Sequence, residues 1–222
     1  MSSFKELLNQ SRGYEAFDRK EAEVEERMKD RVQRFYLPAG KEAKIIFLDD
    51  DPIILEEHQL RINGDWRNWF TCRRNLPNED CVICKELGDH PSTVGYYTIL
   101  DLSKYENKKG QTVQNTIKLF APKFKALQMI KRASQKRGGL QYWVCDVYRS
   151  SADAFNVGDV FEFEEKTDLE SIKQLNPEAR ILNYEDILAP KTNEELRNIL
   201  NRGTESSVNS GVDEIDKDNV DF

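Results

Sequence analysis

The sequence predicts a mainly β fold with peripheral helices, in the form of a small barrel or sandwich. Three observations predict this α+β class. Short runs rich in β-branched and aromatic residues recur over residues 31–165. Turn signals such as Asn63-Gly64 and Gly138-Gly139 separate these runs, and a single stretch with helical spacing follows Pro122. Several short strands at this spacing are typical of small barrels and sandwiches.

Four regions follow one another along the chain. Residues 1–30 are rich in Glu, Lys and Arg with few apolar anchors, and we expect a solvated helix or a charged arm. Residues 31–165 carry the strands, and residues 166–203 form a helical flank whose last helix is capped by Thr192 or Asn193. Residues 204–222 are mainly polar and acidic, and we expect a disordered acidic tail.

Two local elements have the strongest signals. Asn63-Gly64 predicts a two-residue hairpin, because both central positions of a type I′ turn need positive φ. The stretch 123–137 predicts a helix in which Phe124, Leu127 and Ile130 share one face. Lysines and arginines occupy the other faces of this helix.

The net charge of the 222-residue chain is −7, from 33 basic and 40 acidic residues. The distribution is uneven. Residues 31–150 carry 20 basic and 14 acidic groups, whereas residues 1–30 carry 6 and 8, residues 151–203 carry 6 and 12, and residues 204–222 carry 1 and 6. The average argues against a polyanionic ligand, but a basic centre of net +6 is compatible with one.

We expect no membrane span, because no apolar run reaches the roughly 18 residues that a spanning helix needs. The first 20 residues lack the basic region and apolar stretch of a secretory signal, so we expect a cytoplasmic protein. In a reducing compartment, four cysteines, three of them within residues 72–84, indicate metal binding rather than disulfides.

A cluster of cysteines and histidines predicts a zinc site. Cys81 and Cys84 have the Cys-x2-Cys spacing with which two thiolates hold one ion, and Cys72 lies nine residues before Cys81. We expect His58 rather than His90 as the fourth ligand, because the hairpin turn pairs the strand of His58 with the strand that ends at Cys72. The alternatives are three unrelated cysteines or a redox Cys-x-x-Cys pair.

The expected Zn²⁺ is structural. Four protein ligands leave no open coordination position, and no glutamate stands in a His-x-Glu or His-Glu-x-x-His pattern. The polar segments within residues 56–92 contain too few apolar residues to fold alone, so we expect the metal to supply folding free energy there. Cys145 alternates with Trp143 and Val147 on an apolar strand face, where we expect it to be buried.

Aromatic and basic residues alternate on the predicted strands of the basic centre. Arg67, Trp69 and Arg73 share one strand face, which predicts a base-stacking platform between cations that neutralise phosphates. Phe120 and Tyr148 are expected to point outward, although core packing is the alternative for any single aromatic residue. The candidate nucleic-acid contacts, with Tyr96 as the alternative to Tyr97, are Arg67, Trp69, Arg73, Arg74, Tyr97, Lys118, Phe120, Lys123, Tyr142 and Tyr148.

The order His58, Cys72, Cys81-x2-Cys84 in a basic, aromatic, strand-rich centre resembles the bacteriophage single-stranded DNA-binding proteins of the T-even helix-destabilising type. The runs AKIIFLDD, GDWRNWFTCR and VGYYTILDL are similar to segments of such proteins. The resemblance covers residues 31–165 and implies an OB-fold, a five-stranded barrel, with a zinc subdomain that clamps single strands without sequence preference. The arm of that family is basic and mediates cooperative binding, whereas residues 1–30 here carry a net charge of −2.

Together with the residues, the resemblance implies a non-enzymatic protein that coats single-stranded DNA in phage replication, recombination and repair, in the host cytoplasm. By the same resemblance, Asp216, Asp218, Asp221 and Phe222 of the tail recruit replication proteins such as a polymerase, helicase or primase, and we expect the tail to compete with DNA for the basic groove. A zinc-containing transcription or recombination adaptor that binds mainly protein is the alternative. A nuclease or deaminase is not favoured, because the carboxylates of Asp49–Asp51 lie in a turn signal, where we expect a solvated loop.

Overall fold

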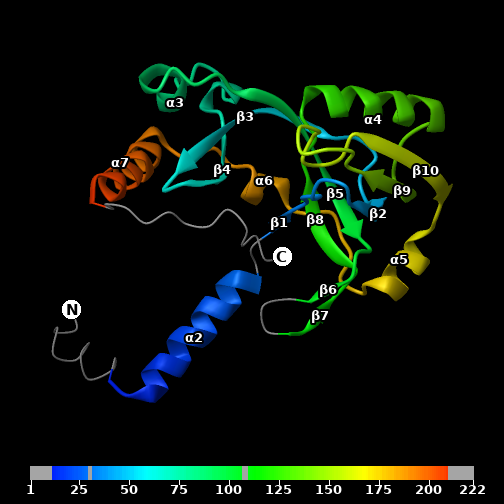
Figure 1. Ribbon diagram of the computed structural model, residues 1–222, viewed down its shortest axis with the longest axis horizontal. Helices are drawn as coiled ribbons and strands as arrows, with labels where there is room; N and C mark the ends of the chain where they lie inside the picture. The colour runs from blue at the N-terminus through cyan, green and yellow to red at the C-terminus, as the bar shows by residue number, and fades with distance from the viewer. Residues whose placement is uncertain (1–11, 30–31, 107–109, 210–222) are drawn as a thin grey trace. The chain divides into compact units, whose positions relative to one another are not determined.

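The computed structural model describes residues 12–29, 32–106 and 110–209, with Arg67 and residues 22–29 and 202–209 described by their backbone only (Figure 1). The chain divides into two compact units, residues 1–33 and 34–222. The first unit contains helix α2 (Tyr14–Lys29), on which Tyr14 and Phe17 are exposed. The helix expected within residues 1–30 is therefore present.

The second unit is built on an eight-stranded sheet whose main path runs β1-β8-β5-β2-β9-β10. Strand β5 (Ser92–Asp101) pairs antiparallel with β8 (Thr116–Phe120) on one side and with β2 (Glu42–Phe47) on the other. The next pairs, β2 with β9 and β9 with β10, are antiparallel too. The remaining strands of this path are β1 (Gln33–Arg34), β9 (Trp143–Tyr148) and β10 (Val160–Lys166), and a separate small sheet contains β6 (Tyr105–Glu106) and β7 (Thr112–Val113).

The sheet is strongly curved. Three strands separate β8 from β10, so a flat sheet would place them about 19 Å apart at about 4.8 Å per strand. Instead, the ring centroids of Phe120 on β8 and Phe161 on β10 are 6.3 Å apart, and the ring of Phe47 on β2 lies 5.6 Å from Phe120 and 5.8 Å from Phe163. The sheet therefore wraps round one aromatic core, in which Cys145 is buried as predicted. The described strand pairs leave the path open between β1 and β10.

The predicted hairpin at Asn63-Gly64 is present. Strands β3 (Ile53–Ile62) and β4 (Asp65–Thr71) pair round a turn in which Asn63 has a φ of 52° and Gly64 a φ of 81°. Positive values at both positions are those of a type I′ turn. Strand β3 also pairs with the first half of β5, so β5 connects the curved sheet to the β3–β4 ribbon (Figure 1).

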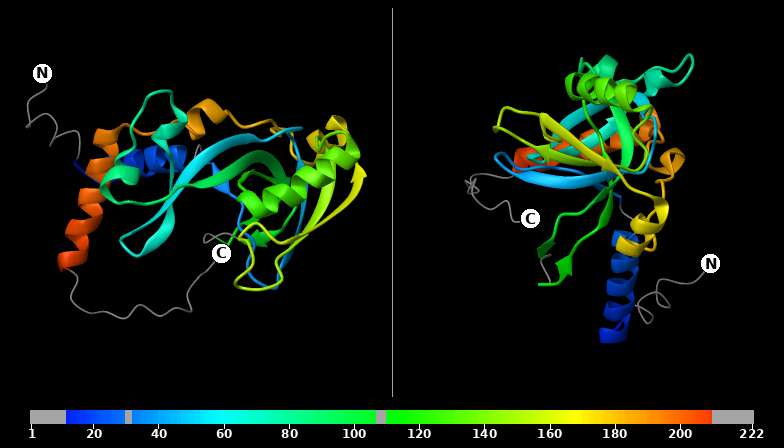
Figure 2. Two further views of the ribbon diagram at one scale, coloured as in Figure 1. Left: turned by 90° about the horizontal axis from the view of Figure 1, so that it is seen from above. Right: turned by 90° about the vertical axis from the view of Figure 1, so that its right-hand side faces the viewer.

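Helix α4 (Phe124–Arg137) is the predicted basic helix, and it lies over the strands of the curved sheet (Figure 2). A Cβ atom at Gly95 on β5 would lie 2.5 Å from Leu127 Cδ1, so the glycine permits close approach of the helix. Ala126 and Ile130, on the side of α4 that faces the sheet, are fully buried. Phe124 does not belong to the buried face of Leu127 and Ile130: it is 58% exposed, because the buried arc of the helix is centred on Ala126 and Ile130.

Three helices follow the sheet: α5 (Leu169–Leu175), α6 (Tyr184–Ile187) and α7 (Asn193–Asn209). Helix α5 buries Ile172 against Ile46 and Leu100, on the sheet face opposite the aromatic core. The predicted cap of the last helix is confirmed at Thr192, whose Oγ1 accepts from the Glu195 N–H while the Glu195 carboxylate accepts from the Thr192 N–H. The structure thus combines a large antiparallel sheet with helices at its periphery, as the α+β class predicts.

Helix α7 continues to Asn209, so the first residues of the expected tail, 204–222, belong to this helix. Residues 210–222, with Asp216, Asp218, Asp221 and Phe222, lie outside the described residues. No helix in the described part of the chain combines the length and the apolar character needed to cross a membrane.

Candidate metal centre and nucleic-acid interface

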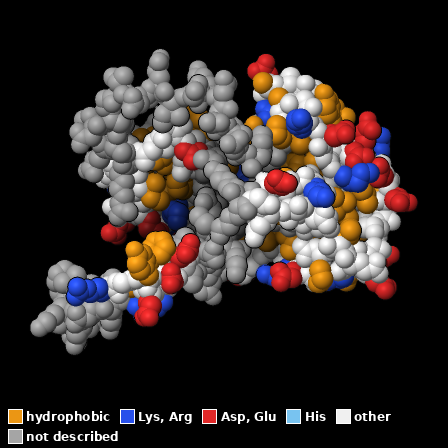
Figure 3. All heavy atoms as spheres, turned by 60° about the horizontal axis from the view of Figure 1, so that its bottom comes forward, with side chains coloured by type: hydrophobic (Ala, Val, Ile, Leu, Met, Phe, Trp, Pro, Cys, Tyr) orange, Lys and Arg blue, Asp and Glu red, His pale blue; other side chains and the backbone are white. Residues whose placement is uncertain are grey.

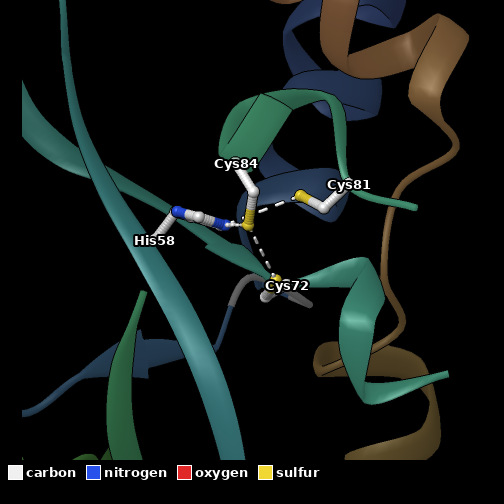
Figure 4. Close-up of side chains that lie close together, drawn as sticks. All are labelled: His58, Cys72, Cys81 and Cys84. Atoms are coloured by element: carbon white, nitrogen blue, oxygen red, sulfur yellow. Dashed lines mark hydrogen bonds between the residues drawn. The ribbon is translucent and has the colours of Figure 1, made fainter. Parts of the chain in front are cut away.

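Four potential metal ligands meet between the β3–β4 ribbon and helix α3 (Val82–Glu86) (Figure 4). Their ligand atoms all lie within 4.8 Å of one another. His58 Nε2 is 3.4 Å from Cys84 Sγ and 3.5 Å from Cys81 Sγ, and Cys72 Sγ is 3.6 Å from Cys84 Sγ. The predicted ligand set is confirmed as a cluster, and His90 is exposed and outside it.

Strand register and one short turn bring these ligands together. His58 on β3 is the cross-strand partner of Phe70, and Cys72 follows two residues later, at the end of β4. The 3-10 turn η1 (Arg73–Asn75) then reverses the chain, and Asn75 holds it by accepting from the Glu56 N–H at 3.0 Å and donating to the Glu56 carbonyl at 2.9 Å. Cys81 precedes α3 and Cys84 lies within it, so both thiols face the ribbon.

The dimensions of the cluster fit a tetrahedral zinc ion. Zn–S bonds of about 2.3 Å and Zn–N bonds of about 2.0–2.1 Å place neighbouring ligand atoms about 3.5–3.8 Å apart. Three of the ligand pairs are separated by 3.4, 3.5 and 3.6 Å, and every pair lies within 4.8 Å. Asp89 Oδ2 lies 2.5 Å from the other ring nitrogen of His58, Nδ1. A carboxylate in this position orients the imidazole and leaves Nε2 for the metal. The sequence does not reveal Asp89, because a single aspartate in a polar loop has no distinguishing pattern.

The three thiols differ in how readily they ionise. Burial raises the pKa of Cys84 to about 12, and the neighbouring Cys72 adds to the shift; burial also raises the pKa of Cys72. At Cys81 burial acts in the same direction, but backbone hydrogen bonds, that of Cys84 first, outweigh it and lower the pKa to about 7. Adjacent thiolates repel one another, so a cation is needed before all three ionise together near neutral pH.

Helix α7 covers this cluster from a distant part of the chain. Leu196 is 1% exposed and packs with Phe70, Cys72, Cys81 and Ile83. This small apolar group encloses the metal ligands, although the segment around the cysteines is itself mostly polar. The apolar cover of the metal ligands therefore includes a residue from the expected helical flank.

Polar contacts fasten α7 to the cysteine segment. Asn193 Oδ1 accepts from the Val82 N–H at 3.0 Å, and Asn193 Nδ2 donates to the Asp80 carbonyl at 3.0 Å. On the surface, Arg197 pairs with Glu86 at 2.6 Å. No local sequence pattern marks these contacts, which join residues about 111 positions apart.

The opposite face of the β3–β4 ribbon carries Trp69. Gln59 and Trp69 are cross-strand partners, so their side chains share this face. The guanidinium of Arg34 lies 4.5 Å from the centre of the Trp69 ring, held by two hydrogen bonds of 2.8 Å to the buried carboxylate of Glu57. Lys123 Nζ donates to Gln59 Oε1 at 3.2 Å. A partly exposed indole thus has one cation over its ring, Arg34, and a second, Lys123, bound to its cross-strand partner Gln59; only Lys123 was expected from the sequence.

Two of the expected nucleic-acid contacts belong to the aromatic core. Phe120 is 0% exposed and Tyr97 is 1% exposed, and both rings pack against Phe47. Their expected outward orientation is wrong. Strands β5 and β8 are covered on both faces, by the aromatic core and by the cluster around Ile172, so alternation along them does not identify a solvent face.

Two further candidates are held by contacts within the fold. Lys118 is 12% exposed and pairs with the buried Asp101 at 2.7 Å. Tyr142 is partly buried against the cluster around Ile172, and its φ is 66°. It precedes β9, so the strand alternation expected from residue 141 begins only at Trp143.

The remaining candidates have different environments. Arg73 lies in η1, not on the strand face of Trp69, and pairs with Glu79 at 2.8 Å, whereas Arg74 is exposed. Tyr148 on β9 is exposed, as expected. The side chain of Arg67 lies outside the described part of the chain.

Asp49–Asp51 were expected to form a solvated loop, and this expectation is wrong for Asp49. Asp49 is buried, and its carboxylate accepts from the Thr98 N–H and from the Tyr184 hydroxyl. Burial raises the pKa of Asp49. Asp50 accepts from the Leu140 N–H at 2.8 Å. These carboxylates therefore join α6 and the start of β9 to the sheet.

Comparison with protein-family models, curated proteins and solved structures gives no match to this chain.

Proposed function

We propose that the protein binds single-stranded DNA without sequence preference and holds a structural Zn²⁺ between His58, Cys72, Cys81 and Cys84. The observation that carries the proposal is Trp69, a partly exposed indole with the Arg34 guanidinium over its ring and Lys123 bound to its cross-strand partner Gln59. Base stacking on an aromatic ring combined with neutralisation of phosphates is the usual basis of sequence-tolerant single-strand binding.

The metal cluster supports this proposal through the ribbon. His58 is on β3 and Cys72 ends β4, so one ion ties together the two strands whose other face carries Trp69. In this proposal the zinc does not touch DNA; it fixes the separation and twist of the strands beneath the indole. The ten-residue β5 continues from the ribbon into the curved sheet, which holds the platform on a rigid core.

The curved antiparallel sheet with its aromatic core inside is compatible with an OB-fold, the architecture implied by the resemblance to the phage single-stranded DNA-binding proteins. By extension, we propose that the protein coats single strands during phage DNA replication, recombination and repair. The C-terminal residues 210–222 would contact a polymerase, helicase or primase.

Titration with oligo(dT) tests the binding proposal. We expect tryptophan fluorescence to be quenched on binding and the quenching to be reversed by salt. Trp69→Ala should lose about 1–3 kcal/mol of binding free energy, whereas Trp69→Phe should keep most of it. If wild-type protein neither quenches nor binds oligo(dT), a zinc-containing adaptor whose ligand is a protein becomes the better interpretation.

Metal analysis tests the zinc proposal. We expect one zinc per chain in purified protein, loss of that zinc in His58→Ala and retention in His90→Ala. Zinc that stays in His58→Ala and leaves in His90→Ala would contradict the assignment of the ligands.

A further inference from the structure

Helix α4 presents a basic surface outside the Trp69 platform. From Asn107 to Cys145 the sequence contains nine basic residues and no acidic one. At 100° per residue, the exposed side chains of α4 fall in one arc of about 160°. Along that arc lie Lys131, Phe124, Gln135, Gln128, Arg132, Lys125, Lys136 and Met129.

Within the part of the chain that the structure describes, the cations on this arc lack carboxylate partners, unlike cations on the sheet. On the face drawn in Figure 3, acidic and basic side chains are interspersed. On the sheet, Lys44 of β2 lies within 3.2 Å of carboxylates on Asp146 and Glu164. Among the described residues, no ion pair involves the four exposed cations of α4, so their positive potential is not neutralised by neighbours.

The N-terminal end of α4 lies near Gln59 and Trp69 on the β3–β4 ribbon. Lys123 precedes α4 directly, and its backbone forms a β-bridge with Val94 on β5. Its amine reaches Gln59, the cross-strand partner of Trp69. Phe124 follows as the first residue of the helix, which extends about 21 Å further at about 1.5 Å per residue.

We infer that the exposed arc of α4 is a second segment of the single-strand path, on which Phe124 stacks a base while Lys125, Lys131 and Arg132 bind phosphates. The inference rests on the proposed function and extends it by naming a further part of the binding surface. An exposed phenyl ring between Lys123 and Lys125 supplies the combination of π-face and cations that Trp69 has on the ribbon. An acidic protein partner would use the cations but would not require a flat ring at position 124.

The test uses the full chain and the binding of a labelled oligo(dT) of about 16 nucleotides, followed by fluorescence anisotropy across a salt titration. Each phosphate contact on a single strand contributes about 0.7 to the slope of log K against log salt concentration. We therefore expect the triple variant K125Q/K131Q/R132Q to flatten the slope by about 2. Phe124→Ala should weaken binding about 5- to 150-fold, and Phe124→Leu should weaken it similarly. Phe124→Trp keeps an aromatic ring and should bind as tightly as wild type.

The matched control is K41Q/K104Q/K191Q, which removes the same charge from exposed lysines outside α4 and should leave the slope unchanged. Circular dichroism should show wild-type folding for each variant, because none of the substituted side chains is buried. Wild-type slopes in the α4 variant, or an equal change in the control, would overturn the inference, as would undiminished binding by Phe124→Ala. The proposed function fails separately, if wild-type protein does not bind oligo(dT) at all.

Discussion

Glu57 is the residue through which the core determines the arrangement of the proposed DNA surface. Its buried carboxylate accepts two hydrogen bonds from Arg34 and one from the Tyr96 hydroxyl at 2.7 Å. Arg34 is in turn positioned over the ring of Trp69. A buried, fully hydrogen-bonded carboxylate of this kind limits the rotamers of its partners, so the orientation of the surface arginine is set from beneath.

Asp89 should tune the affinity of the metal site without supplying a ligand. Asp89→Asn weakens the partner of His58 Nδ1, and loss of such a partner typically costs about 10–100-fold in metal affinity. Competition with a zinc chelator measures the change. Asp80→Asn is the control, because the Asp80 side chain is exposed and contacts Lys85 rather than a ligand. Equal zinc affinity in the two variants would contradict this role.

Asp49 should make stability fall as pH rises. Burial raises the pKa of Asp49 in the folded state, so the folded protein holds this proton more tightly than the unfolded chain, whose Asp pKa is about 3.9. The stabilising contribution is present below the unfolded pKa and is lost as pH rises through the folded pKa. Asp49→Asn keeps an acceptor for Tyr184 and removes the ionisation. Urea unfolding should therefore show the variant gaining stability relative to wild type between pH 4 and pH 7; a constant difference would contradict the sign.

At the scale of elements, the sequence predicts what local chemistry determines. The Asn63-Gly64 turn, the helix that follows Pro122 and the Thr192 cap depend on residues close in sequence, and each is present. The metal cluster was predictable because cysteine spacing and hairpin register are local as well.

Strand faces and distant partners were not predictable in this way. Phe120 alternates with Lys118, which indicates a polar face, but Lys118 is itself held by the buried Asp101. Tyr97 lies on β5, and both β5 and β8 are covered on both faces, so alternation does not identify a solvent face. Phe124 was grouped on one face with Leu127 and Ile130, because periodicity alone does not show which arc of a helix meets the sheet. Arg34 comes from a two-residue strand, and its contact with Trp69 exists only in the folded chain.

Helix α7 should stabilise the metal cluster through Leu196. Leu196→Ala should lower the free energy of unfolding by about 2–5 kcal/mol in zinc-loaded protein, because a fully buried leucine leaves a cavity. Urea unfolding with and without zinc measures this, and the effect should be smaller without the metal because the ligands are then less constrained. Leu169→Ala, at an exposed position on α5, should change stability by less than about 0.5 kcal/mol. Equal losses with and without zinc would show that α7 and the metal act independently.

At the scale of the whole molecule, the net charge of −7 is the sum of basic and acidic segments that form different parts of the fold. The basic centre contains the ribbon, the metal cluster and α4. The acidic residues 151–203, for which the sequence indicates only a solvated flank, form β10, α5, α6 and the start of α7. Strand β10 packs Phe161 and Phe163 against the aromatic core, α5 covers the opposite sheet face, and α7 covers the metal cluster. Their apolar sides have structural roles, while their acidic side chains are mostly exposed.

Deletion of residues 210–222 should tighten binding to single-stranded DNA at low salt. The deletion removes five acidic residues and one basic residue, which changes the net charge from −7 to −3 and leaves α7 intact. A polyanionic segment competes with phosphates for cations, and salt screens that competition. The control replaces residues 210–222 by a neutral Ser/Gly segment of equal length, which should bind as the deletion does. Wild-type affinity for both variants throughout a salt titration would contradict competition by the tail.

The contact between Leu196 and the cysteines has a consequence for protein synthesis. The last ligand, Cys84, precedes Leu196 by 112 residues, which correspond to about 6–22 s of translation at about 5–20 residues per second. During that interval the nascent chain carries all four ligands without their apolar cover. Zinc bound early would hold the two strands of the ribbon together until α7 has been synthesised. Without zinc, the three thiols of the released chain would be open to oxidation or to binding another soft metal.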